Sequence, residues 1–231
     1  MTAVMQPYLF PYLGYFHLMA AADHLVFYDD VQYINDGWIN RNRLPHGWFT
    51  VPVAAGSLTD SIRERQVAVG PYTHFRKKFL KGFGQRYGKS PYFETAQRMV
   101  HEVFAETPGS VNEMAQRSVC LVADYLGLTL RYSTSTTYTY QRELPTQAKL
   151  LSLLYACRAE RYVNQVGGSH LYDPEVFAAS GVSLNFLQSD LDYSAEEPGL
   201  QYSVLHLLAH HPPQQCREWL QQYTITTPTY A

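Results

Sequence analysis

The chain of 231 residues is 46% apolar and 14% aromatic, which is enough to fill one substantial core and excludes a disordered tail. Lysine and arginine (18) nearly balance aspartate and glutamate (20), so the chain as a whole has no attraction to nucleic acid or to a membrane surface. Three widely spaced cysteines, Cys120, Cys157 and Cys216, favour a reducing, cytoplasmic environment.

The first part of the chain predicts the beginning of a parallel α/β sheet. An apolar strand at Ala3–Met5 leads through a proline-rich loop at Pro7–Gly14 into a helix at Tyr15–Ala22, and a second apolar strand follows at Leu25–Tyr28. One short helix between two strands is typical of the crossover that joins parallel strands.

The middle of the chain predicts a loop and then a helical region. The stretch from Asp29 to Trp48 is polar and aromatic, which favours a functional loop, and Phe49–Val53 predicts a buried strand. Three helices are expected after it, at Thr73–Tyr87, Pro91–Glu106 and Val111–Leu126.

The last part of the chain alternates strands and helices again. A helix is expected after Pro145, another after Asp173-Pro174, and two more near the end of the chain. Ser133–Tyr140 is expected as an exposed strand or as a loop over a site. The expected strands are Leu128–Tyr132, Arg161–Gln165 and Val182–Phe186, and the final helices lie near Ser203–Ala209 and Gln214–Tyr223.

We therefore expect one α/β domain over residues 1–231, with a mainly parallel, Rossmann-like sheet, helices on both faces and helical insertions between Pro71 and Gly127. The chain shows no linker and no internal repeat. Its longest apolar run, around Leu150–Cys157, is interrupted by Ser152 and is too short for a membrane span, so no membrane contact is expected.

Three polar clusters follow predicted strands, at the edge where open α/β sheets bind ligands. Gln6-Pro7-Tyr8 follows the first strand, Asp29–Gln32 follows the second, and Gly167–Tyr172 follows the strand at Arg161–Gln165. These clusters predict a binding pocket, although such loops also contain Gly, Pro and Asp because turns require them.

Asp29 and Asp30 are neighbours at a strand end, so their side chains point to opposite faces and at most one of them is expected to face the pocket. That carboxylate is expected to bind a substrate amine, to orient a hydroxyl or to hold a magnesium ion through water. The alternative is a cap, or an ion pair with Arg41 or Arg43.

The string Trp38-Ile-Asn-Arg-Asn-Arg43 places amides and guanidinium groups beside a tryptophan. Arg41 has the planar fork that binds phosphate or carboxylate, and Asn40 or Asn42 can fix a polar ligand by paired hydrogen bonds. At least one ligand contact is expected here, with a structural tie between loop and sheet as the alternative.

Seven Lys or Arg and no Asp or Glu occur between Arg65 and Phe93. Four aromatic residues of this stretch recur every four residues and predict an apolar stripe toward the core: Phe75, Phe79, Phe83 and Tyr87. Cations lie largely off that stripe, at Arg76, Lys77, Lys78 and Lys81. They form either a solvated face or a docking face for a nucleotide or for an acyl carrier protein with its phosphopantetheine arm.

The chain offers no cysteine nucleophile and no metal-ligand set. Cys120 and Cys157 lie inside predicted helices, and His210-His211 have no carboxylate at helical spacing, so no metal site is expected. His170 lies in the Gly-Gly loop, where it can serve as a general base near neutral pH.

Several strings resemble the WbqC-like protein family in order and spacing: Gln6-Pro-Tyr-Leu-Phe-Pro-Tyr-Leu-Gly-Tyr-Phe16, Asp29-Asp-Val-Gln32, Trp38-Ile-Asn-Arg-Asn-Arg43, Lys89-Ser-Pro-Tyr-Phe93 and Gly181-Val-Ser-Leu-Asn-Phe186. The resemblance covers essentially the whole chain and implies a bacterial protein of O-antigen or natural-product biosynthesis. The chain departs from the family at His206, where Asp is usual, which weakens any role of the C-terminal helix. The motif positions that the resemblance carries over are Gln6, Tyr8, Tyr15, Asp30, Gln32, Asn40, Arg41, Gly167, Gly168 and Tyr172.

A fainter resemblance is to nucleotidylyltransferases of the His-x-Gly-His type, because a strand, a proline-rich loop, Tyr12-Leu-Gly14-Tyr15 and a helix follow one another in that order. Tyr12 and Tyr15 stand where that motif has histidines. A tyrosine cannot bring positive charge to a leaving phosphate, which argues against ordinary adenylyl transfer.

Together these features predict a transferase that moves an acyl or aminoacyl group from a carrier-protein or coenzyme A thioester to an amine of a sugar or small metabolite. Asp30, His170 and Tyr15 are the expected catalytic residues, with Asp30 or His170 as the base. Backbone N–H groups near Gly167-Gly168 are expected to hold the oxyanion. The expected substrate site contains Gln6, Tyr8, Gln32, Trp38, Asn40, Arg41, Gly167, Gly168 and Tyr172.

Two alternatives remain open. A nucleotide-dependent transferase or ligase would bind ATP and magnesium near Gln6–Tyr15. A non-catalytic module would bind a sugar or a partner through its tyrosines and tryptophans.

Overall fold

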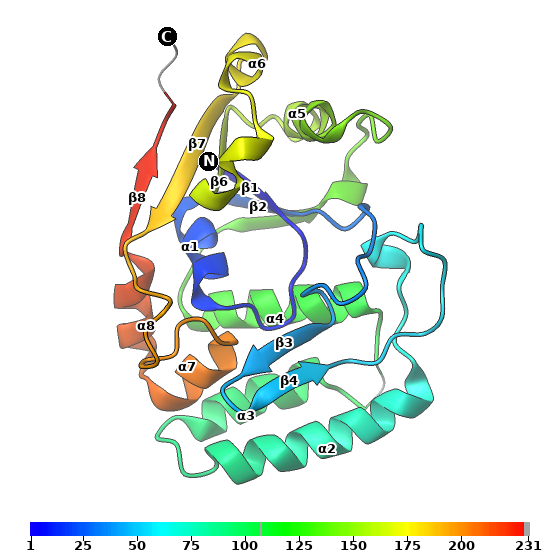
Figure 1. Cartoon of the computed structure of the whole chain (residues 1–231), viewed down its shortest axis with the longest axis vertical. Helices are drawn as coiled ribbons and strands as arrows, with labels where there is room; N and C mark the ends of the chain where they lie inside the picture. Colours follow the sequence, from blue (N-terminus) through cyan, green and yellow to red (C-terminus); the bar gives the residue numbers. More distant parts are fainter. Residues whose placement is uncertain (107, 229–231) are drawn as a thin grey trace.

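A computed structural model describes residues 1–106 and 108–228 and contains a six-stranded mixed sheet in the order β5-β2-β1-β6-β7-β8 (Figure 1). The first five strands are parallel, and β8 pairs with β7 antiparallel. This arrangement confirms the expected mainly parallel α/β fold. The strands are β1 Thr2–Met5, β2 His24–Phe27, β5 Arg131–Thr134, β6 Arg161–Gln165, β7 Ser183–Ser189 and β8 Tyr223–Thr226.

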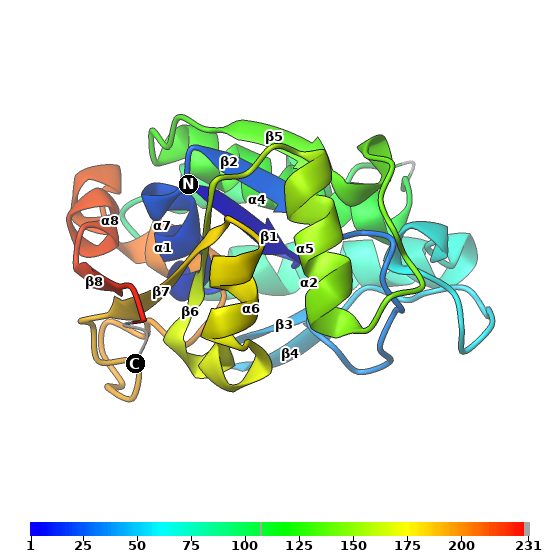
Figure 2. The same ribbon diagram turned by 90° about the horizontal axis from the view of Figure 1, so that it is seen from above.

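Helices cover both faces of the sheet, as Figure 2 shows from above. The helices α1 (Leu13–Ala21) and α4 (Val111–Tyr125) pack on one face, while α5 (Thr146–Ala156) and α6 (Pro174–Ala179) pack on the other. Successive strand residues point to opposite faces of the sheet. Ala3 therefore packs in the core beneath α1 and α4, and Val4 packs in the core beneath α5 and α6.

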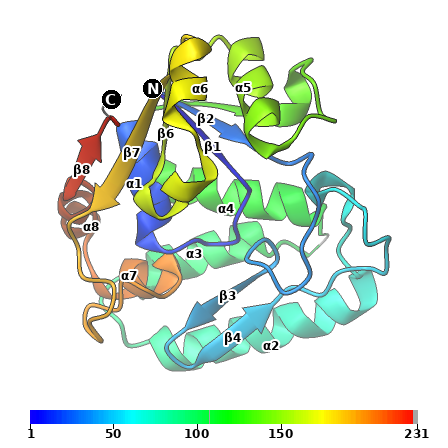
Figure 3. The ribbon, with the colours of Figure 1, turned by 45° about the horizontal axis from the view of Figure 1, so that its top comes forward.

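The segment between β2 and β5 holds the insertions. A two-stranded hairpin, β3 Arg41–Leu44 and β4 Gly47–Thr50, lies along helix α2 (Val69–Tyr87), as Figure 3 shows, and α3 (Phe93–Val103) precedes α4. Near the end of the chain, α7 (Val204–His210) packs against α3 and α8 (Pro213–Leu220) against α1. Short 3-10 helices span Ile62–Glu64, Ser135–Thr137 and Val166–Leu171. None of the described helices is long and apolar enough to cross a membrane.

Several boundaries differ from the sequence prediction. The stretch expected as a loop contains β3. Its residues alternate between buried and partly exposed, but one buried residue is the polar Asn42, so the sequence lacks the apolar alternation of a strand. Helix α2 begins before Pro71, which is tolerated because the first helical turn needs no N–H donors. Strand β5 starts at Arg131 because Gly127, with a φ of 72°, returns the Leu128 N–H to the end of α4.

His24 in β2 is a buried imidazole that its neighbours hold neutral. Arg131 Nη2 donates to its Nδ1 at 2.9 Å, and its Nε2 lies 2.7 Å from the Ser133 Oγ. Burial and the Arg131 charge lower the pKa of His24 to about 4, and burial with nearby histidines does the same for His206. The unfolded chain therefore binds more protons below about pH 6.5, so acid destabilises the fold.

We expect the melting temperature to fall as the pH decreases from about 7 to about 5, and His24→Asn to flatten this dependence because it removes one titrating group. Thermal denaturation over a pH series measures both slopes. The exposed Gln85 supplies the control Gln85→Asn, which removes no titrating group. Equal slopes for the native chain and His24→Asn would contradict the assignment.

Candidate functional site

The sheet has a topological switch point between β1 and β6. The chain leaves β1 toward α1 on one face and leaves β6 toward α6 on the other face. The loops Gln6–Tyr12 and Val166–Tyr172 therefore separate and open a crevice at the carboxyl ends of the strands. Open α/β sheets bind their ligands at such points.

Two adjoining cavities of about 640 Å³ and about 360 Å³ occupy this crevice, and Tyr8, Tyr12, Gln165 and Gly167 line both. We call them together the switch-point cleft. Both volumes fall in the range of small-molecule sites. The larger cavity also contacts His17, Trp38, Gln188, Tyr193 and Gln201, and the smaller one contacts Gln6, Tyr15, Asn164 and Gly168.

Aromatic rings form one continuous wall of the cleft. Ring centroids are 5.5 Å apart for Tyr193 and Tyr12, 6.5 Å for Tyr12 and Tyr8, and 5.4 Å for Tyr8 and Trp38. The wall continues onto the hairpin, where Trp48 lies 5.0 Å from Trp38. Such rings offer an apolar face and a polar tip to the same ligand.

Side-chain amides form the polar part of the cleft. Gln165, the last residue of β6, donates to the Gly14 carbonyl at 2.8 Å and accepts from the Tyr12 hydroxyl at 3.1 Å. The Tyr12 ring lies over Gly14 so closely that a Cβ at position 14 would collide with it. Gln201 also lines the larger cavity, and its Oε1 is buried with no hydrogen-bond partner in the described part of the chain.

His17 and Tyr193 form a hydrogen-bonded pair on the larger cavity. His17 Nε2 lies 2.9 Å from the Trp219 carbonyl, which can only accept, so Nε2 carries the proton and Nδ1 accepts from the Tyr193 hydroxyl at 3.2 Å. Burial lowers the pKa of His17, although the Trp219 carbonyl and Asp190 oppose this, and burial raises the pKa of Tyr193 to about 12. The pair is a neutral hydroxyl–imidazole couple near neutral pH.

Arg43, not Arg41, is the arginine whose charge acts on Tyr8 of the cleft. Its guanidinium lies 5.1 Å from the Tyr202 ring, and its charge opposes the burial that raises the pKa of Tyr8. Arg41 instead binds Asp36 Oδ1 at 3.0 Å and lies over Trp48 at 4.6 Å, so it braces the loop before β3.

The structure brings six of the predicted site residues into the cleft. Tyr15 is buried, and its hydroxyl donates to the Gln6 carbonyl at 3.0 Å, so it positions the loop after β1. Burial raises the pKa of Tyr15 well above its usual value. The six residues are Gln6, Tyr8, Tyr15, Trp38, Gly167 and Gly168.

Asp30 lies beside β5 and not among the residues that line the cleft. It accepts from Ser135 Oγ at 2.5 Å, Tyr140 OH at 2.7 Å and Arg142 Nε at 2.7 Å. Burial alone would raise the pKa of Asp30, but these three hydrogen bonds outweigh it and hold the pKa below its usual value. Asp29 is buried and accepts from Asn112 and Ser135.

Other predicted residues lie near the cleft or away from it. His170 is exposed on the 3-10 helix Val166–Leu171, and Tyr172 accepts from Asn164 Nδ2 at 2.8 Å. Asn40 joins the Tyr33 hydroxyl to the Val51 carbonyl, and Gln32 donates to the Leu58 carbonyl. Arg76 Nε donates to the Phe104 carbonyl, whereas the remaining docking candidates are exposed: Lys77, Lys78 and Lys81.

The sequence prediction missed His17, Arg43, Gln165, Tyr193 and Gln201. Gln165 ends a predicted strand, so the strand-end rule could have found it. The same rule gives no signal for His17, Tyr193 or Gln201, which lie outside the strand ends. In the described part of the chain, no three His, Cys, Asp or Glu side chains gather as metal ligands.

Comparison with known proteins places the chain in a family. The model of the WbqC-like protein family matches residues 6–218, so the chain belongs to that family. An uncharacterized protein of Mycobacterium tuberculosis is 27% identical over 217 residues, which cover 90% of this chain and 92% of that protein. No solved structure matches the chain.

Phe10 anchors the loop that carries Tyr8 and Tyr12. Its N–H donates to Ser118 Oγ on α4 at 2.8 Å, and its carbonyl accepts from Ser203 Oγ at 2.8 Å. The residue is fully buried and has a φ of 42°, a left-handed conformation that few residues other than glycine adopt.

We expect Ser118→Ala to destabilise the protein by about 1–3 kcal/mol, because it leaves the buried Phe10 N–H without an acceptor. Chemical denaturation measures the loss. Ser169→Ala, at an exposed serine, is the control and changes stability little. If both variants unfold at the same denaturant concentration as the native chain, the anchor is unimportant.

Proposed function

We propose that the protein is a transferase that acylates or aminoacylates the amine of a sugar or similar polyhydroxylated metabolite, using a carrier-protein or coenzyme A thioester as donor. The observation that carries the proposal is the combined lining of the switch-point cleft by ring faces and side-chain amides. Tyr8, Tyr12 and Trp38 offer stacking surfaces, while Gln165 and Gln201 offer hydrogen bonds. A ligand with apolar C–H faces and many hydroxyls fits both.

The His17–Tyr193 pair supports a proton-transfer role within the cleft. In the proposed step the amine nitrogen attacks the thioester carbonyl carbon, so a C–N bond forms and the C–S bond breaks. The amine proton passes to the Tyr193 oxygen while the Tyr193 proton moves to His17 Nδ1. The proton then returns along the same path to the departing thiolate.

The oxyanion of this step needs hydrogen-bond donors. Gly167 and Gly168 line the cleft in the first turn of a 3-10 helix, where the N–H groups of Val166 and Gly167 precede the first i→i+3 hydrogen bond and have no partner within the helix. We assign the oxyanion to these backbone groups, as in other acyl transfers. No covalent enzyme intermediate is required, because the amine attacks the thioester directly.

The donor is proposed to dock on α2. Lys77, Lys78 and Lys81 are exposed, and α2 contains no acidic residue. An acidic carrier protein matches this face in charge. The free cysteines Cys120, Cys157 and Cys216 fit the proposed location in the cytoplasm.

A nucleotide-dependent reaction is the second candidate. Gly14, in the first turn of α1, lines the larger cavity, and the amino end of a helix attracts phosphate. A thermal-shift panel separates the candidates because a ligand that binds the folded state raises the melting temperature. Stabilisation by amino sugars and thioesters supports acyl transfer, whereas stabilisation by ATP with magnesium alone supports the second candidate.

We expect Tyr193→Phe to lower kcat by about a hundredfold or more while leaving the affinity for the acceptor unchanged, because only the proton path is lost. Steady-state kinetics with the best acceptor and thioester of the panel measure kcat, and calorimetry measures affinity. Asp30→Asn and His170→Ala are compared in the same assay. If kcat falls only in Asp30→Asn or only in His170→Ala, that residue and not Tyr193 is the base.

We expect Lys77→Glu with Lys81→Glu to raise KM for an acyl carrier protein about tenfold or more, because like charges then oppose docking. KM for the corresponding free pantetheine thioester should stay the same. Reversal of the exposed Lys89, outside α2, is the matched control. Equal effects on both donors would disprove carrier docking at α2.

A further inference from the structure

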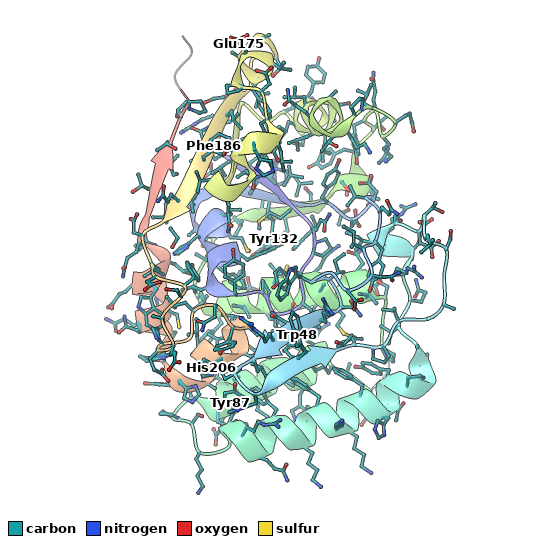
Figure 4. All side chains as sticks on the ribbon, in the orientation of Figure 1. Trp48, Tyr87, Tyr132, Glu175, Phe186 and His206 are labelled. Atoms are coloured by element: carbon teal, nitrogen blue, oxygen red, sulfur yellow. The ribbon has the colours of Figure 1, made fainter. Side chains whose placement is uncertain are left out.

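A second cavity of about 370 Å³ lies between α2 and the hairpin, outside the switch-point cleft. Its floor consists of aromatic side chains, with Phe49 of the hairpin 4.9 Å from Phe79 of α2. Tyr87, at the carboxyl end of α2, also lines the cavity, and Figure 4 shows it beside His206 of α7. We call this cavity the α2–hairpin groove, lined by Phe49, Phe75, Phe79, Phe83 and Tyr87 and by the residues described next.

One edge of the groove carries two cations with a gap between them. Lys78, Gly82 and Arg86 follow one another at intervals of four residues, so they lie on one face of α2. A Cβ at Gly82 would meet only the Arg86 Nη1, at 3.3 Å, so the guanidinium extends back over the glycine. This geometry leaves room for a small group above Gly82, flanked by both cations.

These cations have no anionic partner in the described part of the chain, where the ion pairs involve other residues. Helix α2 contains no acidic side chain that could neutralise them. Like charges on one helix destabilise it, so an external anion is electrostatically favourable here. The adjacent rings of Phe75 and Phe79 remain only partly buried.

We propose that the α2–hairpin groove is a binding site for a small amphipathic anion, a molecule with an apolar body and one carboxylate or phosphate head. The head lies above Gly82, between Lys78 and Arg86, and the body lies along Phe79 and Phe83. A neutral apolar molecule leaves the two cations unpaired, and a purely polar anion leaves the ring floor exposed. The volume falls in the range of small-molecule sites.

The groove is separate from the switch-point cleft, so this inference does not depend on the proposed transferase activity. Phe49 and Trp48 are successive strand residues and point to opposite faces of the hairpin. Phe49 faces α2, while Trp48 contacts Trp38 of the cleft. The groove and the cleft share no lining residue, although Trp48 also lines the groove.

The probe for this site is anilinonaphthalene sulfonate, an aromatic anion whose fluorescence rises in apolar surroundings. We expect the full chain to bind it, and decanoate or decyl phosphate to displace it, whereas decanol does not. The relative potency of decanoate and decyl phosphate identifies the preferred head group. Displacement by decanol as readily as by the anions would overturn the proposal.

Variants test the location of the bound anion. Gly82→Leu fills the space above Gly82, so we expect the dye fluorescence that decyl phosphate displaces to disappear. Leucine is a good helix former, so the variant should still fold. Lys78→Gln with Arg86→Gln raises Kd for decyl phosphate about tenfold or more, because two charge-assisted contacts are lost. The matched control, Lys77→Gln with Lys81→Gln on the same helix, leaves Kd unchanged.

Two results would contradict the proposal. The first is displaceable binding that survives Gly82→Leu, since the head group would then lie elsewhere. The second is an equal loss of affinity in the two double variants, which would indicate a general charge effect of α2. Circular dichroism and melting temperature confirm that each variant is folded before its affinity is compared.

Discussion

The hydrogen bonds of the Phe10 peptide groups are the constraint on which the cleft depends. Ser118 from α4 binds its N–H, and Ser203 at the start of α7 binds its carbonyl. Asn42 of the hairpin binds the same carbonyl. Segments that are far apart in the sequence thus meet at one buried residue, and their hydrogen bonds hold its left-handed φ of 42°. The loop after β1 therefore has one path, and that path puts Tyr8 and Tyr12 on the wall of the cleft.

The hairpin connects the loop after β1 to the α2–hairpin groove. Its buried face, with Asn42 and Phe49, is tied to the β1 loop and to α2. Its other face presents Arg43 and Trp48, which are cross-strand partners, to the aromatic wall. A two-stranded ribbon is marginally stable alone, and the packing of Phe49 against α2 supplies the support that it needs, while Trp48 on the other face stays half exposed. The hairpin contributes both residues to the groove and contacts the cleft through the Trp48–Trp38 pair.

The sequence predicts the helices and strands that have a local pattern of residues. It misses the contacts between residues that are far apart in the sequence. β1, α1 and β2 follow from an apolar run, a proline-rich loop and a helix of crossover length, and Gly167-Gly168 marks the second loop of the switch point. β3 was missed because Arg41 and Arg43 alternate with a buried asparagine, which resembles a polar loop. The sequence alone cannot decide between Arg41 and Arg43 as the ligand contact, because both side chains have the same planar fork. Only the packing of Asp36 and Trp48 around Arg41 distinguishes them. The His17–Tyr193 pair joins positions 176 residues apart, a separation that no local pattern encodes.

The many tyrosines, 19 in this chain, distinguish the two cavities chemically. Buried tyrosines such as Tyr15, Tyr33 and Tyr72 use their hydroxyls to hold backbone or amide groups, so they are structural. The tyrosines of the cleft, Tyr8, Tyr12 and Tyr193, line its wall with hydroxyls beside their ring faces. The Tyr12 and Tyr193 hydroxyls donate to Gln165 and His17 and keep their oxygen lone pairs as acceptors, so a wall of this kind favours a ligand that is itself hydroxylated. The groove replaces these rings by Phe49, Phe79 and Phe83 and puts its polarity into cations at one edge. The difference between the two linings thus supports the two separate proposals, a polyhydroxylated ligand in the cleft and an amphipathic anion in the groove.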